Sequence, residues 1–268
     1  MEPYLIALDL DGTLLNYEKE IGVHTKSILQ KCRERGHQVM IATGRPFRAS
    51  ESYYKELGLT TPIVNFNGAH VHYPNHPEWE MTHAPIPRLA ALAILDTCQL
   101  FHIKNVMVEV LDTIYVEKFD ADLLKTFNLD SNDVIIGPIA QNLKTDPTSV
   151  LIRTGQEYLD KLMEALDSNY AETIEQRSWG YPSDIIEIIR RGISKASGLA
   201  RVSNYLGIPK ERIIAFGDED NDIEMLEFAG MGVAMGNARP EIKSHANFIT
   251  TTNVEEGIAS FLENTLLK

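Results

Sequence analysis

The chain has 268 residues and a formal net charge of −13, from 25 Lys and Arg against 38 Asp and Glu. This acidic balance argues against nucleic acid or an anionic membrane as the main partner, and it leaves room for an anionic small molecule where the site supplies its own positive charge. No stretch approaches the roughly 20 apolar residues that a membrane span needs, and the N-terminal apolar run lacks a basic leader. The hydrophobic content of 44% and two cysteines without metal-ligand spacing are typical of a globular protein with free thiols. We expect a cytoplasmic monomer or homodimer.

The first predicted element is a buried strand that ends in two aspartates. Residues 4–8 are apolar or aromatic, as in a strand buried on both faces within a parallel sheet. Asp9 and Asp11 follow, with Gly12 placed to turn the backbone. Because side chains two apart on a strand point the same way, we expect both carboxylates on one side of the strand tip. Paired carboxylates repel unless a cation or proton intervenes, so this stretch predicts a Mg²⁺ site, with aspartates in an ordinary turn as the alternative.

Helix and strand patterns then alternate as far as residue 68. The expected elements are a helix at 25–35, a strand at 39–42, a helix at 46–57 and a strand at 63–65. The second strand runs into Thr43-Gly44-Arg45, and the third runs into Asn67-Gly68. This alternation is typical of a parallel α/β sheet.

The pattern changes after residue 68, and residues 85–190 are expected to form a small α/β domain inserted in the first one. A hairpin at 71–73 and 80–83 precedes it. Within it we expect helices at 89–101, 121–127 and 156–167, a polar connection after the second helix, and strands at 106–110, 114–117, 149–153, 171–174 and 185–189. The enclosing domain then comprises residues 1–84 and 191–268.

The first pattern resumes in the last third of the chain. The expected elements are a helix at 195–206, a strand at 212–216, a short strand at 232–235 and a closing helix at 254–266. Asp218 follows the strand at 212–216, and Asp222 lies four residues further along at a helix start. In open parallel sheets ligands bind beyond the carboxyl ends of the strands, so the polar residues that follow these strands are expected to converge. Carboxylate oxygens with few nitrogen or sulfur neighbours suit Mg²⁺, above all where phosphate oxygens complete its shell.

Four motifs in this order resemble those of the haloacid dehalogenase superfamily of aspartate-nucleophile phosphatases. They are Asp9-Leu10-Asp11-Gly12-Thr13, Thr43-Gly44-Arg45, Lys195 within Ser194-Lys195-Ala196, and Gly217-Asp218-x-x-Asn221-Asp222. The size and position of the insertion are similar to those of the Cof-type branch, so the likeness spans the whole chain. It implies a Rossmann-like parallel-sheet core with an inserted α/β cap of the C2 type, which closes during the reaction and sets specificity.

The resemblance implies a Mg²⁺-dependent hydrolysis in two steps. Asp9 attacks phosphorus and forms an aspartyl-phosphate, while Asp11 protonates the leaving alkoxide and then activates the water. This division requires an ionised Asp9 and an Asp11 that can hold a proton, so their pKa values must differ. The implied metal ligands are the Asp9 side chain, the backbone carbonyl of Asp11 and Asp218, with Asp222 orienting the shell.

The same resemblance assigns the groups that bind the phosphoryl group. They are the Thr43 hydroxyl, neighbouring backbone N–H groups such as that of Gly44, and the Lys195 ammonium, with Asn221 holding their geometry. Taken alone, Lys195 has the alternative of being an ordinary surface lysine.

Several further residues are candidate substrate contacts: Arg45, Asn67, Gly68, Arg177 and Trp179. Trp179, with Arg177 and Tyr181 nearby in the sequence, would stack on a planar substrate, or else be a core or hinge aromatic. Arg45 would contact substrate or pair with an acid.

The branch acts on small phosphorylated metabolites, among them sugar phosphates and vitamin- or flavin-related phosphates. The passages Pro62–Ala69 and Ala215–Asp222 are similar to those of flavin-pathway phosphatases that act on 5-amino-6-(5-phospho-D-ribitylamino)uracil. Two other functions remain open. One is a phosphotransferase or phosphomutase that uses the same nucleophile and passes the phosphoryl group to a sugar hydroxyl. The other is a non-catalytic metabolite-binding module, which a replacement of Asp9 or Asp11 would have favoured, and both residues are present.

Overall fold

The computed structural model describes residues 2–180 and 183–268. The chain divides into two compact units. Unit 1 comprises Met1–Thr82 and Ser194–Lys268, and unit 2 comprises His83–Ile193. The sequence placed the insertion at residues 85–190, so unit 2 begins two residues earlier and ends three residues later than expected.

Unit 1 is built on a five-stranded parallel sheet in the order β14-β13-β12-β1-β2. Its strands are β1 (Leu5–Leu8), β2 (Gln38–Ile41), β12 (Ile213–Gly217), β13 (Met231–Ala234) and β14 (Phe248–Ile249). β1 lies between β12 and β2, and Leu8 pairs with Phe216 on one side and Ile41 on the other. Every residue of β1 is buried, as expected for a strand covered on both faces. The predicted Rossmann-like α/β core is confirmed.

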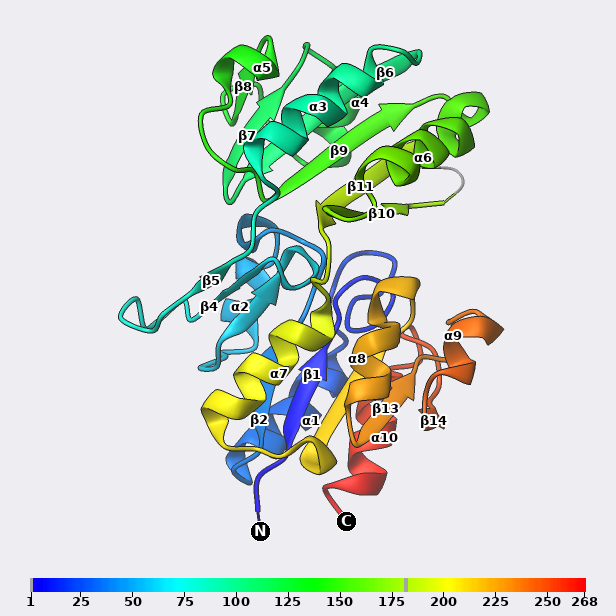
Figure 1. Ribbon diagram of the computed structural model, residues 1–268. Helices are drawn as coiled ribbons and strands as arrows, with labels where there is room; N and C mark the ends of the chain where they lie inside the picture. The colour runs from blue at the N-terminus through cyan, green and yellow to red at the C-terminus, as the bar shows by residue number, and fades with distance from the viewer. Residues whose placement is uncertain (1, 181–182) are drawn as a thin grey trace. The chain divides into compact units, whose positions relative to one another are not determined.

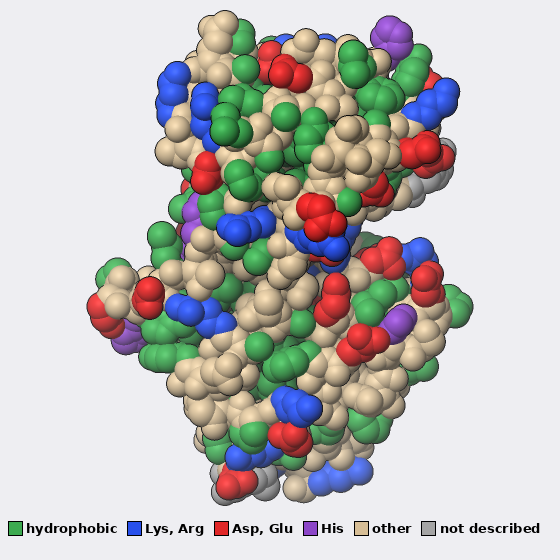
Figure 2. Space-filling model, in the orientation of Figure 1, with side chains coloured by type: hydrophobic (Ala, Val, Ile, Leu, Met, Phe, Trp, Pro, Cys, Tyr) green, Lys and Arg blue, Asp and Glu red, His purple; other side chains and the backbone are tan. Residues whose placement is uncertain are grey.

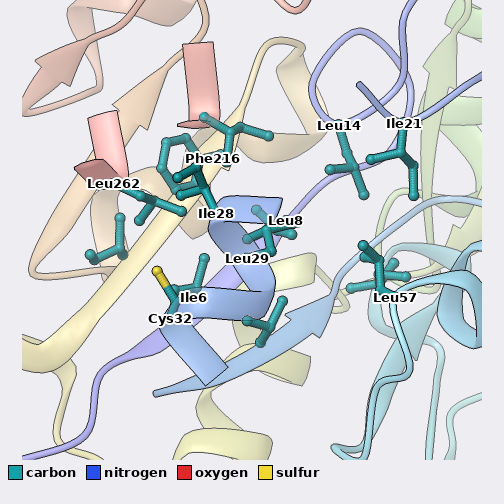
Figure 3. Packing of buried hydrophobic residues seen from close by; sticks show 14 of the residues in the cluster. Ile6, Leu8, Leu14, Ile21, Ile28, Leu29, Cys32, Leu57, Phe216 and Leu262 are labelled. Atoms are coloured by element: carbon teal, nitrogen blue, oxygen red, sulfur yellow. The ribbon is translucent and has the colours of Figure 1, made fainter. Parts of the chain in front are cut away.

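Helices cover both faces of this sheet, because successive strand residues point to opposite sides. Ile6 and Leu8 pack in one apolar cluster with α1 (Val23–Glu34) and α10 (Gly257–Thr265), and Figure 3 shows part of this packing. Leu5 and Ala7 pack in a second cluster with α7 (Lys195–Leu206) and α8 (Ile223–Phe228). Figure 1 shows α7 and α8 in front of the sheet. The two layers hold β1 rigidly, so the position of its carboxyl end is well defined.

A three-stranded sheet follows β2. Its strands are β3 (Ile63–Asn65), β4 (His70–His72) and β5 (Thr82–His83), in that order. β3 pairs antiparallel with β4 and joins the main sheet through a single parallel bridge between Ala42 and Val64. The sequence placed β3 within the parallel sheet, but the turn η2 (Phe66–Gly68) reverses the chain after three residues.

The single helix expected at residues 46–57 is wrong. The segment forms a short 3₁₀ helix, η1 (Phe47–Ala49), followed by α2 (Glu51–Glu56). Ser50 separates them, since its hydroxyl donates to the Pro46 carbonyl at 3.1 Å and accepts a hydrogen bond from Asn65 Nδ2 at 2.9 Å. A serine hydroxyl that bonds to nearby carbonyls competes with regular helix geometry. The spacing of apolar residues cannot reveal a partner that lies on another element.

Unit 2 is an α/β domain with a six-stranded sheet in the order β10-β11-β9-β6-β7-β8. Its strands are β6 (Ile103–Val110), β7 (Thr113–Val116), β8 (Val134–Ile136), β9 (Ser149–Thr154), β10 (Ile174–Ser178) and β11 (Ile185–Arg190). Its helices are α3 (Arg88–Cys98), α4 (Ala121–Thr126), α5 (Ile139–Asn142) and α6 (Gln156–Tyr170). The helices α3 and α6 pack on one face through an apolar cluster that includes Ile94, Leu162 and Val150.

The strand expected at residues 171–174 is wrong, because α6 continues to Tyr170 and β10 begins only at Ile174. The Tyr170 hydroxyl lies 3.0 Å from the Ala93 carbonyl on α3, and this contact anchors the last turn of α6. The connection expected to be only polar contains β8 and α5.

The closing helix of unit 1 begins three residues later than expected, at Gly257. Glu256 has a left-handed φ of 55° and its carboxylate accepts the Thr25 N–H at 2.5 Å, so it caps α1 instead of extending α10. Two short helices that the structure describes in this unit were not expected, η3 (Lys210–Arg212) and α9 (Pro240–Ser244). A further short helix, η4 (Asp220–Asp222), lies where a helix was expected to begin and leads into α8.

The surface and the thiols agree with the composition. Figure 2 shows Asp and Glu side chains interspersed with Lys and Arg on the visible face of each unit. Cys32 and Cys98 are buried free thiols. Within residues 2–180 and 183–268, no helix has the length and apolar character to cross a membrane.

Candidate active site

Three neighbouring strands of unit 1 bring the predicted polar residues to one edge of the sheet. β1 is followed directly by Asp9, β12 directly by Asp218, and β2 by Thr43 after one residue. Because β1 lies between the other two strands, the three residues lie at neighbouring carboxyl ends. The Asp9 N–H donates to the Phe216 carbonyl at 3.2 Å and ties the end of β1 to β12.

A fully buried lysine joins two of the carboxylates. Lys195 is the first residue of α7, and the Ser194 side chain caps that helix. The Lys195 ammonium donates to Asp9 Oδ1 and to Asp222 Oδ1, each at 2.7 Å. Burial would lower the pKa of Lys195, but the two carboxylates outweigh it and raise the pKa above its ordinary value. Lys195 is therefore a fixed buried cation, and the alternative of a surface lysine is wrong.

Asp222 is held from both sides. Its Oδ1 accepts from Lys195, while its Oδ2 accepts the backbone N–H groups of Asp218 at 2.9 Å and Glu219 at 3.1 Å. The side chain is 0% exposed. Both oxygens are engaged by protein donors, so this carboxylate is suited to orienting its neighbours.

Asp218 receives hydrogen bonds from two neutral side chains. The Thr13 hydroxyl donates to Oδ1 at 2.6 Å, and the Asn237 amide donates to Oδ2 at 3.3 Å. Gly12 makes this approach feasible, because a Cβ atom at that position would lie 2.1 Å from Asp218 Oδ2. The first motif therefore shapes the position of an aspartate two hundred residues away.

The carboxylates of Asp9, Asp218 and Asp222 offer oxygens within 4.8 Å of one another, a set that could hold a metal ion. Among the described residues, Lys195 is the one buried ammonium beside these three carboxylates. Burial, together with Asp222 and Asp218, raises the pKa of Asp9 well above its ordinary value despite Lys195. Burial also raises the pKa of Asp218 to about 7. With one ammonium for three carboxylates, the cluster is short of positive charge and presents oxygen ligands. It therefore fits a divalent cation such as Mg²⁺, which would favour the ionised carboxylates.

The Asp11 carboxylate takes part in a separate, half-exposed ion pair. Arg45 donates to its two oxygens through Nε and Nη2, each at 2.6 Å, and Lys19 Nζ donates at 2.7 Å. The Asp11 side chain is 44% exposed. Burial opposes the shift, but the hydrogen bonds and charge of Arg45, then Lys19, lower the pKa of Asp11 to about 2. Arg45 thus pairs with an acid, one of its two expected roles.

This geometry corrects the expectation that Asp9 and Asp11 extend one strand side by side. β1 ends at Leu8, and Gly12 has a left-handed φ of 77°, so the alternation of a strand does not continue to Asp11. The two pKa values differ, but in the order opposite to the expected one, since burial and neighbouring carboxylates raise the pKa of Asp9 while Arg45 and Lys19 lower that of Asp11. The roles expected for Asp9 and Asp11 need the reverse order, so a cation at the cluster and a change of partner for Asp11 would have to bring it about. The role of the Asp11 carbonyl as a metal ligand stays a prediction.

The remaining predicted residues of the phosphate site and its surroundings lie in the loops after β2, β3 and β12. Thr43 is buried, and its hydroxyl accepts the Arg45 N–H at 3.2 Å. Asn221 donates through Nδ2 to Asn67 Oδ1 at 2.9 Å. Asn67 is 1% exposed and lies against Gly44, at which a Cβ atom would be 3.1 Å from Asn67 Oδ1. Gly68, also buried, has a φ of 104°.

Arg177 and Trp179 belong to unit 2. Arg177 lies on β10 opposite Glu187 of β11. Trp179 is 45% exposed. Its indole donates through Nε1 to Glu187 Oε2 at 3.3 Å, and its ring centroid lies 5.6 Å from that of Phe127. Tyr181 lies outside the described residues. Trp179 is therefore no core aromatic, and its role toward a substrate stays a prediction.

One site residue was missed by the sequence reasoning. The Asn237 amide donates to the Gly12 carbonyl at 2.8 Å as well as to Asp218, and its own oxygen accepts the Asn253 N–H at 3.1 Å. Asn237 follows β13 closely, so the same strand-end argument that found Asp218 could have found it.

Comparison with known proteins agrees with this geometry. Residues 6–262 match the family model described as haloacid dehalogenase-like hydrolase. The chain is 47% identical to the 5-amino-6-(5-phospho-D-ribitylamino)uracil phosphatase YitU of Bacillus subtilis (strain 168), over 98% of this chain and 97% of that protein. It is 32% identical to the pyridoxal phosphate phosphatase YbhA of Escherichia coli (strain K12), over 100% of both chains. Among solved structures, a haloacid dehalogenase-like hydrolase from Bacteroides thetaiotaomicron superimposes with a TM-score of 0.84 at 29% identity, over 98% of this chain and 99% of that one.

Proposed function

The chain belongs to the haloacid dehalogenase-like hydrolases and is a phosphatase of that family; from this premise we propose that it hydrolyses a small phosphorylated metabolite through an aspartyl-phosphate on Asp9, with Mg²⁺ as its cofactor. The observation that carries the proposal is the buried cluster in which Lys195 lies 2.7 Å from Asp9 and three carboxylates offer oxygens within 4.8 Å of one another. Structural aspartates seldom share so much uncompensated charge in a buried place.

In the first step an Asp9 carboxylate oxygen attacks phosphorus, and the bond from phosphorus to the leaving oxygen breaks. A Mg²⁺ ion held by Asp9 and Asp218 would neutralise charge on the phosphoryl oxygens. Lys195 keeps Asp9 in place and adds positive charge beside it. The leaving alkoxide takes a proton from Asp11. Asp11 can carry that proton only after its ion pairs with Arg45 and Lys19 have opened, since these cations keep it ionised.

In the second step water attacks the phosphorus of the aspartyl-phosphate. Asp11, now ionised, accepts the proton of that water, and Asp9 and inorganic phosphate are released. Thr43 and the Gly44 backbone would hold the phosphoryl oxygens through both steps, because phosphoryl transfer depends chiefly on positioning and charge neutralisation.

For the substrate we propose 5-amino-6-(5-phospho-D-ribitylamino)uracil. Support comes from the relative named for that activity, which is 47% identical over nearly the full length of both chains. A second relative at 32% identity is named for pyridoxal phosphate, so this ester belongs in the same comparison. We propose that residues 85–190 select the leaving group, and that Trp179, with its partly exposed indole, contacts a planar ring.

The test is release of inorganic phosphate from a panel of phosphomonoesters that includes both of these compounds. It is run with Mg²⁺, with a chelator in its place, and with Asp9→Asn. We expect the flavin precursor to give the highest kcat/KM, the chelator to abolish release, and Asp9→Asn to lose at least about 10³-fold in kcat. Equal release by wild type and Asp9→Asn would refute the nucleophile. Transfer of phosphate to an added sugar in place of free phosphate would favour a phosphotransferase.

A further inference from the structure

The loop that follows β3 has an unusual backbone. Phe66, Asn67 and Gly68 have successive φ values of 49°, 53° and 104°. Glycine adopts this region freely and asparagine tolerates it, but a phenylalanine there is an outlier. Phe66 and Asn67 are each 1% exposed, so packing holds the conformation. Buried backbone outliers of this kind persist where the surroundings enforce them, and they cluster at functional sites.

The contacts of this loop show what its conformation achieves. The Asn67 N–H donates to the Thr43 carbonyl at 3.1 Å, and the Phe66 N–H donates to the Arg45 carbonyl at 3.2 Å. Asn65 Nδ2 donates to the same Arg45 carbonyl at 2.8 Å. The loop therefore engages the carbonyls on both sides of Gly44. In this left-handed turn the two successive N–H groups of Phe66 and Asn67 both face the segment 43–45.

The Asn67 side chain extends the connection to a third strand end. Its Oδ1 accepts a hydrogen bond from Asn221 Nδ2 at 2.9 Å, and Asn221 lies in the loop that also carries Asp218 and Asp222. The strands β2 and β12 are not neighbours, because β1 lies between them. The Asn67–Asn221 contact thus joins the loop after β3, which is hydrogen-bonded to the loop after β2, to the loop after β12. Asp9 follows β1, the strand that lies between β2 and β12.

We propose that Asn67 is a positioning residue, which fixes Thr43 and Gly44 relative to the carboxylate cluster and does not itself contact substrate. The proposal rests on the proposed function, since it assumes that Thr43 and Gly44 receive the phosphoryl group. Its consequence is that the Asn67–Asn221 amide pair adds a side-chain connection between the phosphate-binding loop and the carboxylate cluster to the backbone contacts of the sheet.

The decisive variant is Asn67→Gly, because glycine keeps the left-handed backbone while the side chain with its amide is removed. Asn67→Ala removes the amide and also forces a side chain into that region, so a comparison of the two separates the contact from the strain. Asn221→Ala removes the other partner. The matched control is Asn128→Gly, since Asn128 is an exposed asparagine of unit 2 with a φ of 51°.

We expect Asn67→Gly to lower kcat/KM about 10- to 100-fold, because a small displacement of the groups that hold the phosphoryl group slows the reaction strongly. Inhibition by inorganic phosphate should weaken, and Tm should change little. Asn67→Ala should show the same kinetic loss and a lower Tm. Asn221→Ala should reproduce Asn67→Gly, and the double variant should be no worse than either, because one contact is removed twice. Asn128→Gly should match wild type in every assay.

Hydrogen exchange of the substrate-free protein gives a readout that is independent of turnover. We expect the amides of residues 43–46 to exchange faster in Asn67→Gly than in wild type, and those of unit 2 to be unchanged. Wild-type kinetics and phosphate inhibition in Asn67→Gly, additive losses in the double variant, or unchanged exchange at residues 43–46 would each overturn the proposal. If wild type releases no phosphate from any ester, the proposed function fails, whereas the exchange data still decide whether Asn67 positions this loop.

Discussion

Asp9 and Asp11 lie two residues apart, and unit 1 surrounds them in different ways. Asp9 is buried with Lys195, Asp218 and Asp222, and its contacts are made through the backbone and through buried side chains. Asp11 is 44% exposed and is engaged by two long, flexible cations. The first environment keeps a carboxylate in place, and the second lets a carboxylate exchange partners. A nucleophile needs the former, and a group that both gives and takes a proton needs the latter.

The largest effect is expected for Lys195→Met, which would remove the cation from the buried surroundings of Asp9. Asp9 and Asp222 would lose their only buried cation among the described residues. We expect the free energy of unfolding in chelator to fall by about 3–5 kcal/mol, as when one partner of a buried pair is removed, and Mg²⁺ to restore part of it. Urea unfolding with and without Mg²⁺ measures this loss of stability.

The control is Lys19→Met, which removes a cation beside the exposed Asp11 and should change stability by less than about 1 kcal/mol. Equal effects of the two variants would show that burial does not distinguish the two carboxylates.

An intermediate effect is expected for Gly12→Ala, which would disturb the buried side without removing a charge. The new Cβ would lie 2.1 Å from Asp218 Oδ2 at a φ of 77°. We expect the Mg²⁺ concentration for half-maximal stabilisation to rise about 10- to 100-fold, as when groups that orient metal ligands are lost. Thermal unfolding across a Mg²⁺ titration measures it.

Gly36→Ala is the matched control, since Gly36 has a φ of 90° and no atom within 4 Å of the added Cβ. It should lower stability by about 1 kcal/mol through its backbone alone, with an unchanged Mg²⁺ midpoint. A shifted midpoint in Gly36→Ala would mean that backbone strain, and not the contact with Asp218, alters metal binding.

The smallest effect concerns the exposed side, where Arg45→Met would remove the main partner of Asp11. In wild type the pKa of Asp11 is lowered to about 2, below its unfolded value near 3.9. Its ionisation therefore adds stability above about pH 4, which is lost as the pH falls toward 2. Because the pair is partly exposed, we expect Arg45→Met to lower stability by at most about 1 kcal/mol at pH 7. The difference from wild type should shrink toward pH 2 in unfolding measurements over that range, and a difference that grows in acid would contradict the assignment.

The sequence predicted the buried surroundings of Asp9 better than the exposed surroundings of Asp11. Asp9, Thr43 and Asp218 follow strands whose order and direction are set by apolar runs, so their convergence follows from sheet topology. Asp222 follows from its spacing of four from Asp218. The helix that begins at Lys195 has the expected bounds, because Ser194 is a strong cap.

What the sequence could not show depends on side-chain partners far apart in the chain. The pairing of Asp11 with Arg45 and Lys19 joins side chains that are 34 and 8 residues away along the chain. The break at Ser50 depends on Asn65, on another element. The left-handed φ of Phe66 contradicts the local preference of its own residue type, and only the contacts of the finished fold enforce it.

The insertion of unit 2 into unit 1 has a consequence for how the protein is made. Leu5 of β1 pairs with Ile213 of β12, so the ribosome must synthesise about four fifths of the chain before the main sheet can close. Unit 2 is continuous and can fold as soon as it emerges, since domains fold as units during synthesis. Until β12 arrives, β1 has an unpaired edge and an apolar surface that would attract aggregation or chaperones. Truncation anywhere after unit 2 but before β12 therefore leaves a folded insert attached to a core that cannot form.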